Sequence, residues 1–153
     1  MLRRLWLMML LLLTLVGSAS SGPCDDVPWD RLKEALVRGD EGDIATLIGS
    51  GRLSLRLDDI SQGRYTAQQA RQLLEAFFSR TDNRFLSYDP CNSSGNRAWS
   101  QATYSYRRRS TTKVSEERLL LEWCVEGQDV RLSGIRSVSM SSHDLIPSGD
   151  GTT

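Results

Sequence analysis

Hydrophobic residues recur along the chain with two spacings, and each spacing predicts a different kind of element. Between residues 66 and 79 the apolar positions lie three and four residues apart, which places them on one face of a helix. They are Ala70, Leu73, Leu74, Phe77 and Phe78. Thr66, followed three positions later by Gln69, is a capping-box pattern, so we expect this helix to begin at Thr66.

Two shorter helices are expected before it. The apolar stripe of the first consists of Trp29, Leu32 and Leu36. Pro28 suits its first turn, and Gly39 suits the left-handed conformation that ends a helix. Asp40 is a favourable N-cap for the second helix. The buried face of that helix would hold Ile44, Leu47 and Ile48.

Strict alternation of apolar and polar residues predicts strands. Residues 52–57 alternate Leu with Arg or Ser, and the polar stretch 58–63 is expected to be a connection. Further strands are expected at 85–88, 98–106, 117–125 and 129–138. The positions of Ile135 and Val138 indicate a bulge in the last strand. The last four strands follow one another in the chain, so we expect an antiparallel meander.

The first 21 residues have the layout of a secretory signal peptide. Arg3 and Arg4 precede an uncharged run from Leu5 to Val16, and small residues follow. A membrane span needs about 20 apolar residues, so the run favours a cleaved signal over an uncleaved anchor. We expect export to the periplasm or the extracellular space, with no stable membrane span after cleavage. Lipid anchoring through Cys24 is disfavoured by Pro23 directly before it.

The segmentation that follows is a signal peptide at 1–21, one domain at 27–138 and a disordered tail at 139–153. The tail is rich in Ser, Gly and Thr. Lys and Arg number 19, as do Asp and Glu, so the formal net charge is zero. Removal of Arg3 and Arg4 with the signal gives a net charge of −2. This balance argues against nucleic acid as a partner.

Catalytic and metal-binding motifs are absent from the sequence. It contains no glycine-rich phosphate loop, no HExxH and no GxSxG, and its one histidine, His143, lies in the tail. We expect neither a metal nor an organic cofactor, and no catalytic residue is assigned. The pattern favours a binding or scaffolding module over an enzyme.

Three cysteines allow three single pairings, and none belongs to a CxxC motif. In an antiparallel meander Cys91 and Cys124 reach the same end of the sheet, which favours a bridge between them. Cys24 would then be free, lipidated or paired with another chain. The alternative is that all three cysteines are reduced and packed as small hydrophobic residues.

Three stretches carry a resemblance to a known superfamily: DRLKEALVRGDEGDIATLI, RYTAQQARQLLEAFFSR and RLLLEWCVEG with its closing strand VRLSGIRSV. In their order they resemble the nuclear transport factor 2-like (cystatin-like) superfamily, and most closely an exported bacterial family of unknown function. In that family the third helix follows a Tyr-Ser/Thr-x-x-Gln-Ala pattern, here Tyr65 to Ala70. The resemblance implies an α+β cone in which three N-terminal helices pack on a curved antiparallel sheet.

The resemblance also implies where function would lie. A cone of this kind encloses a pocket for a small apolar ligand, and the pocket candidates are Phe77, Trp99, Tyr104 and Trp123. Some superfamily members are isomerases or cyclases with a pocket carboxylate as the base, which is the enzyme alternative. Others form dimers through the open face of the sheet, so a structural homodimer is a third alternative. The one basic cluster in the sequence, Arg107 to Arg109 with Lys113, could meet an anionic partner at the cell envelope.

Overall fold

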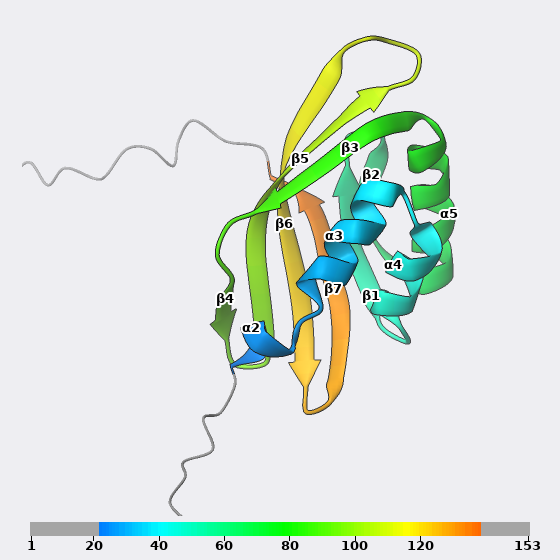
Figure 1. Ribbon diagram of the computed structural model, residues 1–153. Helices are drawn as coiled ribbons and strands as arrows, with labels where there is room; N and C mark the ends of the chain where they lie inside the picture. Colours follow the sequence, from blue (N-terminus) through cyan, green and yellow to red (C-terminus); the bar gives the residue numbers. More distant parts are fainter. Residues whose placement is uncertain (1–21, 139–153) are drawn as a thin grey trace, which may run out of the picture.

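Figure 1 shows the computed structural model, which describes residues 22–138. Helices cover one face of a seven-stranded sheet. The helices are α2 (Pro23–Asp26), α3 (Trp29–Arg38), α4 (Glu41–Ile48) and α5 (Ala67–Ser79). The strands are β1 (Arg52–Leu57), β2 (Ile60–Thr66), β3 (Thr81–Tyr88), β4 (Asn92–Ser94), β5 (Arg97–Arg108), β6 (Val114–Glu126) and β7 (Asp129–Ser137). The predicted signal peptide and tail lie outside the described residues.

The predicted helix boundaries are confirmed, and their caps explain them. Gly39 has φ 72° and ends α3, while the Asp40 carboxylate accepts a hydrogen bond from the Asp43 amide at the start of α4. At α5, Thr66 and Gln69 form both hydrogen bonds of a capping box. Among residues 22–138, no helix is long and apolar enough to cross a membrane.

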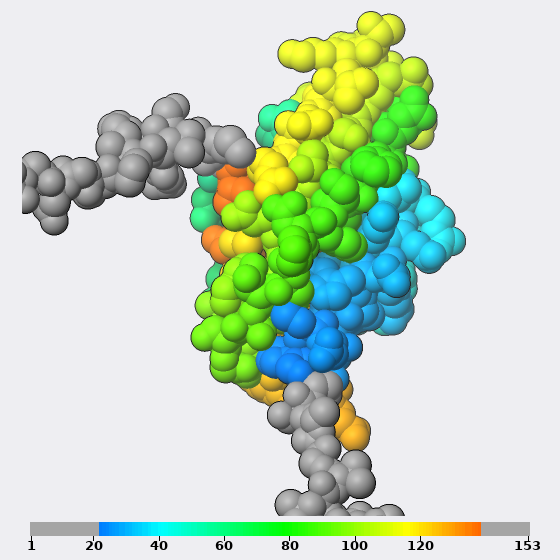
Figure 2. Space-filling view, turned by 60° about the vertical axis from the view of Figure 1, so that its left-hand side comes forward, coloured from blue at the N-terminus to red at the C-terminus, as the bar shows by residue number. Residues whose placement is uncertain are grey.

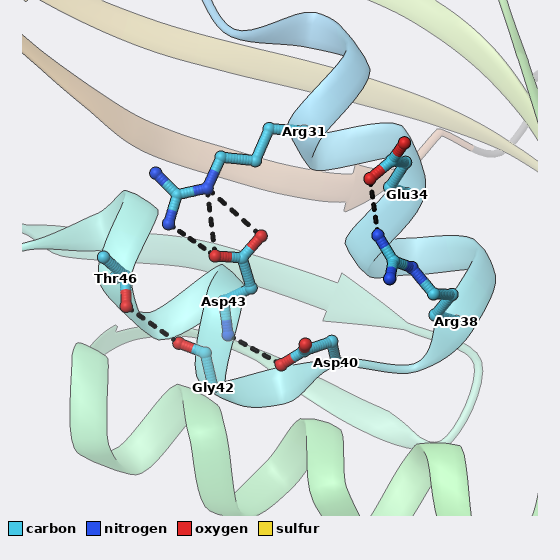
Figure 3. Close-up of polar contacts among 7 residues, drawn as sticks. All are labelled: Arg31, Glu34, Arg38, Asp40, Gly42, Asp43 and Thr46. Atoms are coloured by element: carbon cyan, nitrogen blue, oxygen red, sulfur yellow. Dashed lines mark hydrogen bonds and ion pairs between the residues drawn. The ribbon is translucent and has the colours of Figure 1, made fainter.

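An ion pair joins α3 to α4, as Figure 3 shows. The Arg31 Nε donates to both carboxylate oxygens of Asp43, at 2.9 and 3.2 Å. This contact lowers the pKa of the Asp43 carboxyl group and raises the pKa of the Arg31 guanidinium. Arg38 pairs with Glu34 one turn earlier on the outside of α3. The ion pairs on the outer side of α3 and α4 therefore form within these two helices.

The sheet has the order β2-β1-β7-β6-β5-β3, and β4 adds to β5 at one edge. The predicted meander is confirmed as β3, β5, β6 and β7, all antiparallel. The expected antiparallel sheet is confirmed, with one parallel junction where β1 pairs with β7. Three helices were expected, and the one-turn α2 is a fourth.

Two strands were missed in the sequence. The expected connection at 58–63 is mostly strand β2, which forms a hairpin with β1 through Asp58 and Asp59. Gly63 interrupts the alternation of side chains that would indicate a strand. A side chain does not fit at this position, because the ring of Tyr65 occupies the space, with its Cζ only 2.8 Å from the position that a Cβ would take. The other missed strand, β4, has three exposed polar residues and therefore no apolar alternation.

The hairpin of β5 and β6 is longer than its hydrophobic residues indicate. The segment between the strands expected at 98–106 and 117–125 is partly strand, since Arg107 pairs in register with Val114. Figure 2 shows this hairpin projecting beyond the body of the domain. The predicted bulge in the last strand is confirmed, and it falls opposite the step from Glu122 to Trp123.

Alternation along the strands separates the sheet into two faces. Leu53 and Leu55 of β1, Leu121 of β6 and Ile135 of β7 are fully buried under the helices. Their neighbours in the chain point to the other face, on which no described helix packs. We call this second surface the open face.

The predicted bridge between Cys91 and Cys124 is wrong, because Cys91 is bonded to Cys24. Strand β4 holds Cys91 at the outer edge of β5, whereas Cys124 lies on β6 and faces the open side. Helix α2 brings Cys24 to that edge, where Figure 2 shows α2 beside the green strands. Among the described cysteines, Cys124 is free.

The disulfide should stabilise the fold by restricting the unfolded chain. It joins residues 67 positions apart, so replacing Cys24 with Ser should lower the free energy of unfolding by about 2–4 kcal/mol. Urea unfolding with and without reductant would measure this loss. Cys124→Ser is the matched control and should unfold like the wild type. A large loss in Cys124→Ser with none in Cys24→Ser would contradict the pairing.

Candidate functional site

The interior of the cone is occupied by its own side chains. Phe77, Tyr104 and Trp123, three of the four predicted pocket residues, have no exposed surface. The Tyr104 hydroxyl donates to the carbonyl oxygen of Leu36 on α3 at 3.2 Å, so its polar end is satisfied inside the core. The fourth predicted residue, Trp99, lies half-buried on the open face. The structure does not bring these four residues together around one cavity.

A tyrosine and a carboxylate form a hydrogen-bonded pair at one end of the cone. The Tyr106 hydroxyl donates to Glu117 Oε1 at 2.6 Å, and its ring packs edge-on against Phe77 at 5.1 Å. Burial raises the pKa of Tyr106, and the Glu117 carboxylate raises it further. The second oxygen of Glu117, Oε2, is buried and has no hydrogen-bond partner in the described structure. Tyr106 is therefore held as a neutral donor to this carboxylate.

The basic cluster that stands out in the sequence is partly neutralised in the fold. Arg107 pairs with Asp82 of β3 at 2.8 Å, and Arg108 pairs with Asp58 and Asp59 in the β1–β2 turn. These ion pairs tie the long hairpin to both neighbouring parts of the sheet. The Arg107 guanidinium also lowers the pKa of the Asp82 carboxyl group. Two of the four basic residues thus have local acidic partners.

On the open face, one row of residues crosses five strands in register. It runs from Arg64 through Ser54, Gly134 and Glu122 to Trp99, so strands β2, β1, β7, β6 and β5 each contribute one residue. The middle of the row forms a depression, because Ser54 has a small side chain and Gly134 has none. An open groove of about 490 Å³ lies over this region. Its lining includes Arg52, Ser54, Arg64, Arg97, Glu122 and Arg136.

Glu122 holds two of the four arginines in the groove. Its Oε1 accepts from Arg97 at 2.6 Å, and its Oε2 accepts from Arg136 at 2.7 Å. The Glu122 side chain is only 12% exposed, whereas Arg97 is 61% exposed. Gly134 makes room for this arrangement, because a Cβ there would come within 2.6 Å of Glu122 Oε2. One carboxylate is therefore shared between two guanidinium groups.

The other two arginines of the groove have no acidic partner among the described residues. Arg52 and Arg64 are both exposed, and neither takes part in an ion pair or a side-chain hydrogen bond within residues 22–138. Because Glu122 is the one acidic residue in the lining, the groove carries a surplus of positive charge. The groove is the strongest candidate site in the structure.

Cys124 also lines the groove. Its thiol lies 3.6 Å from Glu126 Oε1, and burial followed by the Glu126 charge raises the pKa of that thiol. A raised pKa keeps the thiol protonated and unreactive. Cys124 therefore contributes surface to the groove and no nucleophile.

Sequence reasoning missed this groove. The four arginines lie at positions 52, 64, 97 and 136, and no run of sequence brings them together. The available signal was alternation, since Arg52 and Arg97 both occupy the polar phase of a strand. Their convergence depends on the parallel contact between β1 and β7, which the sequence pattern does not reveal.

Solved structures with the same fold are similar to this chain over most of its length. One is a DUF4783 family protein from Bacteroides uniformis, 12% identical, with a TM-score of 0.60 over 75% of this chain and 98% of that one. A cystatin-fold protein from Novosphingobium aromaticivorans is 11% identical, with a TM-score of 0.59 over 78% and 100%. An LEH-like epoxide hydrolase from M. tuberculosis is 13% identical, with a TM-score of 0.55 over 75% and 80%.

These structures confirm the fold. No protein-family model matches the chain, and no curated protein matches its sequence. The similar structures have nuclear transport factor 2-like and cystatin folds, so the α+β cone expected from the sequence is correct. At these identities the similarity establishes the architecture, which proteins of different function share.

The position of Glu122 can be tested through Gly134. Gly134→Ala should lower the free energy of unfolding by roughly 1–3 kcal/mol, because the new methyl group displaces the carboxylate from Arg136. In a Glu122→Ala background the same change should cost much less. Gly42→Ala is the control, since its new Cβ meets only an aspartate oxygen at 3.4 Å. An equal cost in both backgrounds would contradict the contact.

Two buried tyrosines and one half-buried tyrosine should make the fold sensitive to alkali. Burial raises the pKa of Tyr88, Tyr104 and Tyr106, with Asp30 adding to the effect at Tyr88. A pKa raised in the folded state favours folding below the pKa of the unfolded group, about 10, and this stability is lost at higher pH. Urea unfolding should therefore show constant stability up to about pH 9 and a fall above about pH 10.

The ultraviolet absorbance of tyrosinate provides the readout for this prediction. The signal of these three residues should appear together with unfolding. Tyr106→Phe should reduce the pH dependence, because one of the three groups is removed. Ionisation of all three in a chain that remains folded would contradict their burial.

Proposed function

We propose that this protein is an exported binding module that takes up an anionic ligand on the open face of its sheet. The observation that carries the proposal is the groove, in which four arginines surround a floor of small residues and two of the four share one carboxylate. Guanidinium groups bind carboxylate, sulfate and phosphate through paired hydrogen bonds. Arg52 and Arg64 have these donors unused within the described structure.

Export is supported by two features of the chain. The first 21 residues have the pattern of a signal peptide, and the Cys24–Cys91 disulfide requires a compartment that is not reducing. The proposed location is the periplasm or the extracellular space. The ligand is placed on the outer face of the cone and not in its interior, because Phe77 and Tyr104 fill the interior.

The homodimer alternative is less well supported by the charges. A dimer through the open face would bring two arginine-rich grooves together, and like charges that meet without partners oppose association. The exposed hydrophobic residues Phe85 and Val114 lie near the hairpin end of the sheet, away from the groove. A dimer formed through the groove would need a bridging anion.

The enzyme alternative rests on one contact, that of Glu117 with Tyr106. A base and a hydroxyl donor are the groups that a pocket-carboxylate enzyme needs. Tyr106 is only 1% exposed, however, and its hydroxyl already donates to Glu117. A substrate would have to displace that hydrogen bond and the packed ring of Phe77. The arrangement suits closure of the cone better than catalysis.

Retention on a heparin-type sulfated matrix tests the proposal. At pH 7 the full chain has a formal net charge of zero, so net charge alone gives no reason for a polyanion to hold it. We expect retention at low salt, and we expect Arg52→Gln/Arg64→Gln to elute at clearly lower salt, because two charge-assisted contacts are lost. Neither side chain has a partner in the described structure, so the fold should be preserved, which circular dichroism would verify.

The matched control is Lys33→Gln/Arg71→Gln. It removes the same charge from α3 and α5, which cover the opposite face of the sheet. This variant should elute with the wild type. If the control and the groove variant lose retention equally, binding depends on total charge and the groove is not the site.

A further inference from the structure

We infer that the ligand is a stretch of acidic polysaccharide that lies across the strands and places successive carboxylate or sulfate groups on separate arginines. This inference rests on the proposed anion-binding function and specifies its ligand. Three properties of the groove carry it: its span, its floor and the state of its arginines.

The span of the groove exceeds the reach of a single anion. Arg64 is on β2 and Arg97 is on β5, four strand intervals apart in the sheet. Neighbouring strands lie about 4.8 Å apart, so the arginine-bearing strands extend over roughly 19 Å. One carboxylate can reach arginines two strand intervals apart, as Glu122 does with Arg97 and Arg136, but it cannot span all four intervals. A ligand that uses both ends of the groove must carry at least two anionic groups.

The arginines form two subsites of different character. Arg52 and Arg64, on neighbouring strands at one end, have no acidic partner in the described part of the chain. Arg136 on the middle strand β7 and Arg97 on β5 at the other end are held by Glu122 but remain partly exposed. The first subsite would bind an anionic group directly. The second would bind a further group through donors that Glu122 leaves unused, because a guanidinium group has five N–H donors.

The floor of the groove favours a sugar chain over a nucleic acid strand. Ser54 and Ser133 line it, Gly134 lies beside Ser54 in register, and the lining residues include no aromatic side chain. Proteins that bind single-stranded nucleic acid place successive bases on aromatic rings. The single aromatic residue in the row, Trp99, lies at the far end, where it offers one apolar surface next to Arg97. A flat polar floor between cationic rims suits hydroxyl-rich rings with acidic substituents.

The experiment is a length series measured by isothermal titration calorimetry. The probes are oligogalacturonates, from the monomer to oligomers longer than the roughly 19 Å span, with a sulfated oligosaccharide and oligodeoxythymidylate of matched charge. For the wild-type protein we expect affinity to rise by about 100-fold or more from the monomer to span-length oligomers, as for linked binding sites. Oligodeoxythymidylate should bind at least tenfold more weakly than the sugar oligomer of equal charge.

Variants at the two ends of the groove complete the test. In Arg52→Gln/Arg64→Gln the gain with length should fall to less than about threefold, because one subsite is lost. Arg97→Gln removes a donor from the other subsite and should also reduce the gain. Lys33→Gln/Arg71→Gln should retain the full gain. The dependence of the binding constant on salt should also become less steep when groove arginines are removed.

The possible outcomes separate this inference from the proposed function. If monomer and long oligomers bind with the same affinity at the groove, the polysaccharide inference is overturned and the anion-binding function stands. If oligodeoxythymidylate binds as tightly as the sugar oligomer, the ligand class is wrong. If no anion binds, both the inference and the proposed function are overturned.

Discussion

The architecture depends on how the interior of the cone is filled. Tyr104 and Tyr106 point inward from strand β5, where they pack against α3 and α5, and their hydroxyl groups are satisfied by Leu36 and Glu117. In a cone of this fold the same space could hold a ligand. Here aromatic rings occupy it, and each buried hydroxyl keeps a hydrogen-bond partner, which removes the main penalty of burying a polar group. The packed rings of Tyr104 and Tyr106 therefore connect the sheet to α3 and α5.

Because the interior is filled, the proposed binding site lies on the other side of the sheet. Successive side chains of a strand point to opposite faces of the sheet. Here the apolar residues point to the helix-covered face, and the polar residues between them point mainly to the open face. Strands β1, β2, β5 and β7 place arginines there, while Gly134 and Ser54 keep the centre low. Glu122 neutralises part of the charge and fixes two guanidinium groups in position. The same strand periodicity thus produces both the packed core and the basic groove.

Much of the fold could be predicted because it is encoded locally. The caps at Gly39, Asp40 and Thr66 and the apolar stripe of α5 located the helices, and alternation located strand β1 and the meander. Strand β2 was missed because Gly63, which leaves room for the ring of Tyr65, interrupts the alternation of its side chains. The disulfide was predicted wrongly because β4 places Cys91 at the edge of the sheet. The groove was missed because it joins residues from positions 52 to 136. Only the parallel contact of β1 with β7 brings them together, and no local pattern records it.

Ligands are proposed to meet the outer face of the sheet while the interior stays closed. Heteronuclear NMR with an acidic oligosaccharide tests this claim most directly, because each backbone amide reports on its own surroundings. We predict that resonances of Ser54, Arg64 and Gly134 shift on titration, whereas those of Phe77 and Leu36 in the packed interior do not. Shifts centred on Phe77 and Leu36, with the outer strands unchanged, would show that the cone opens to its ligand and would contradict the claim.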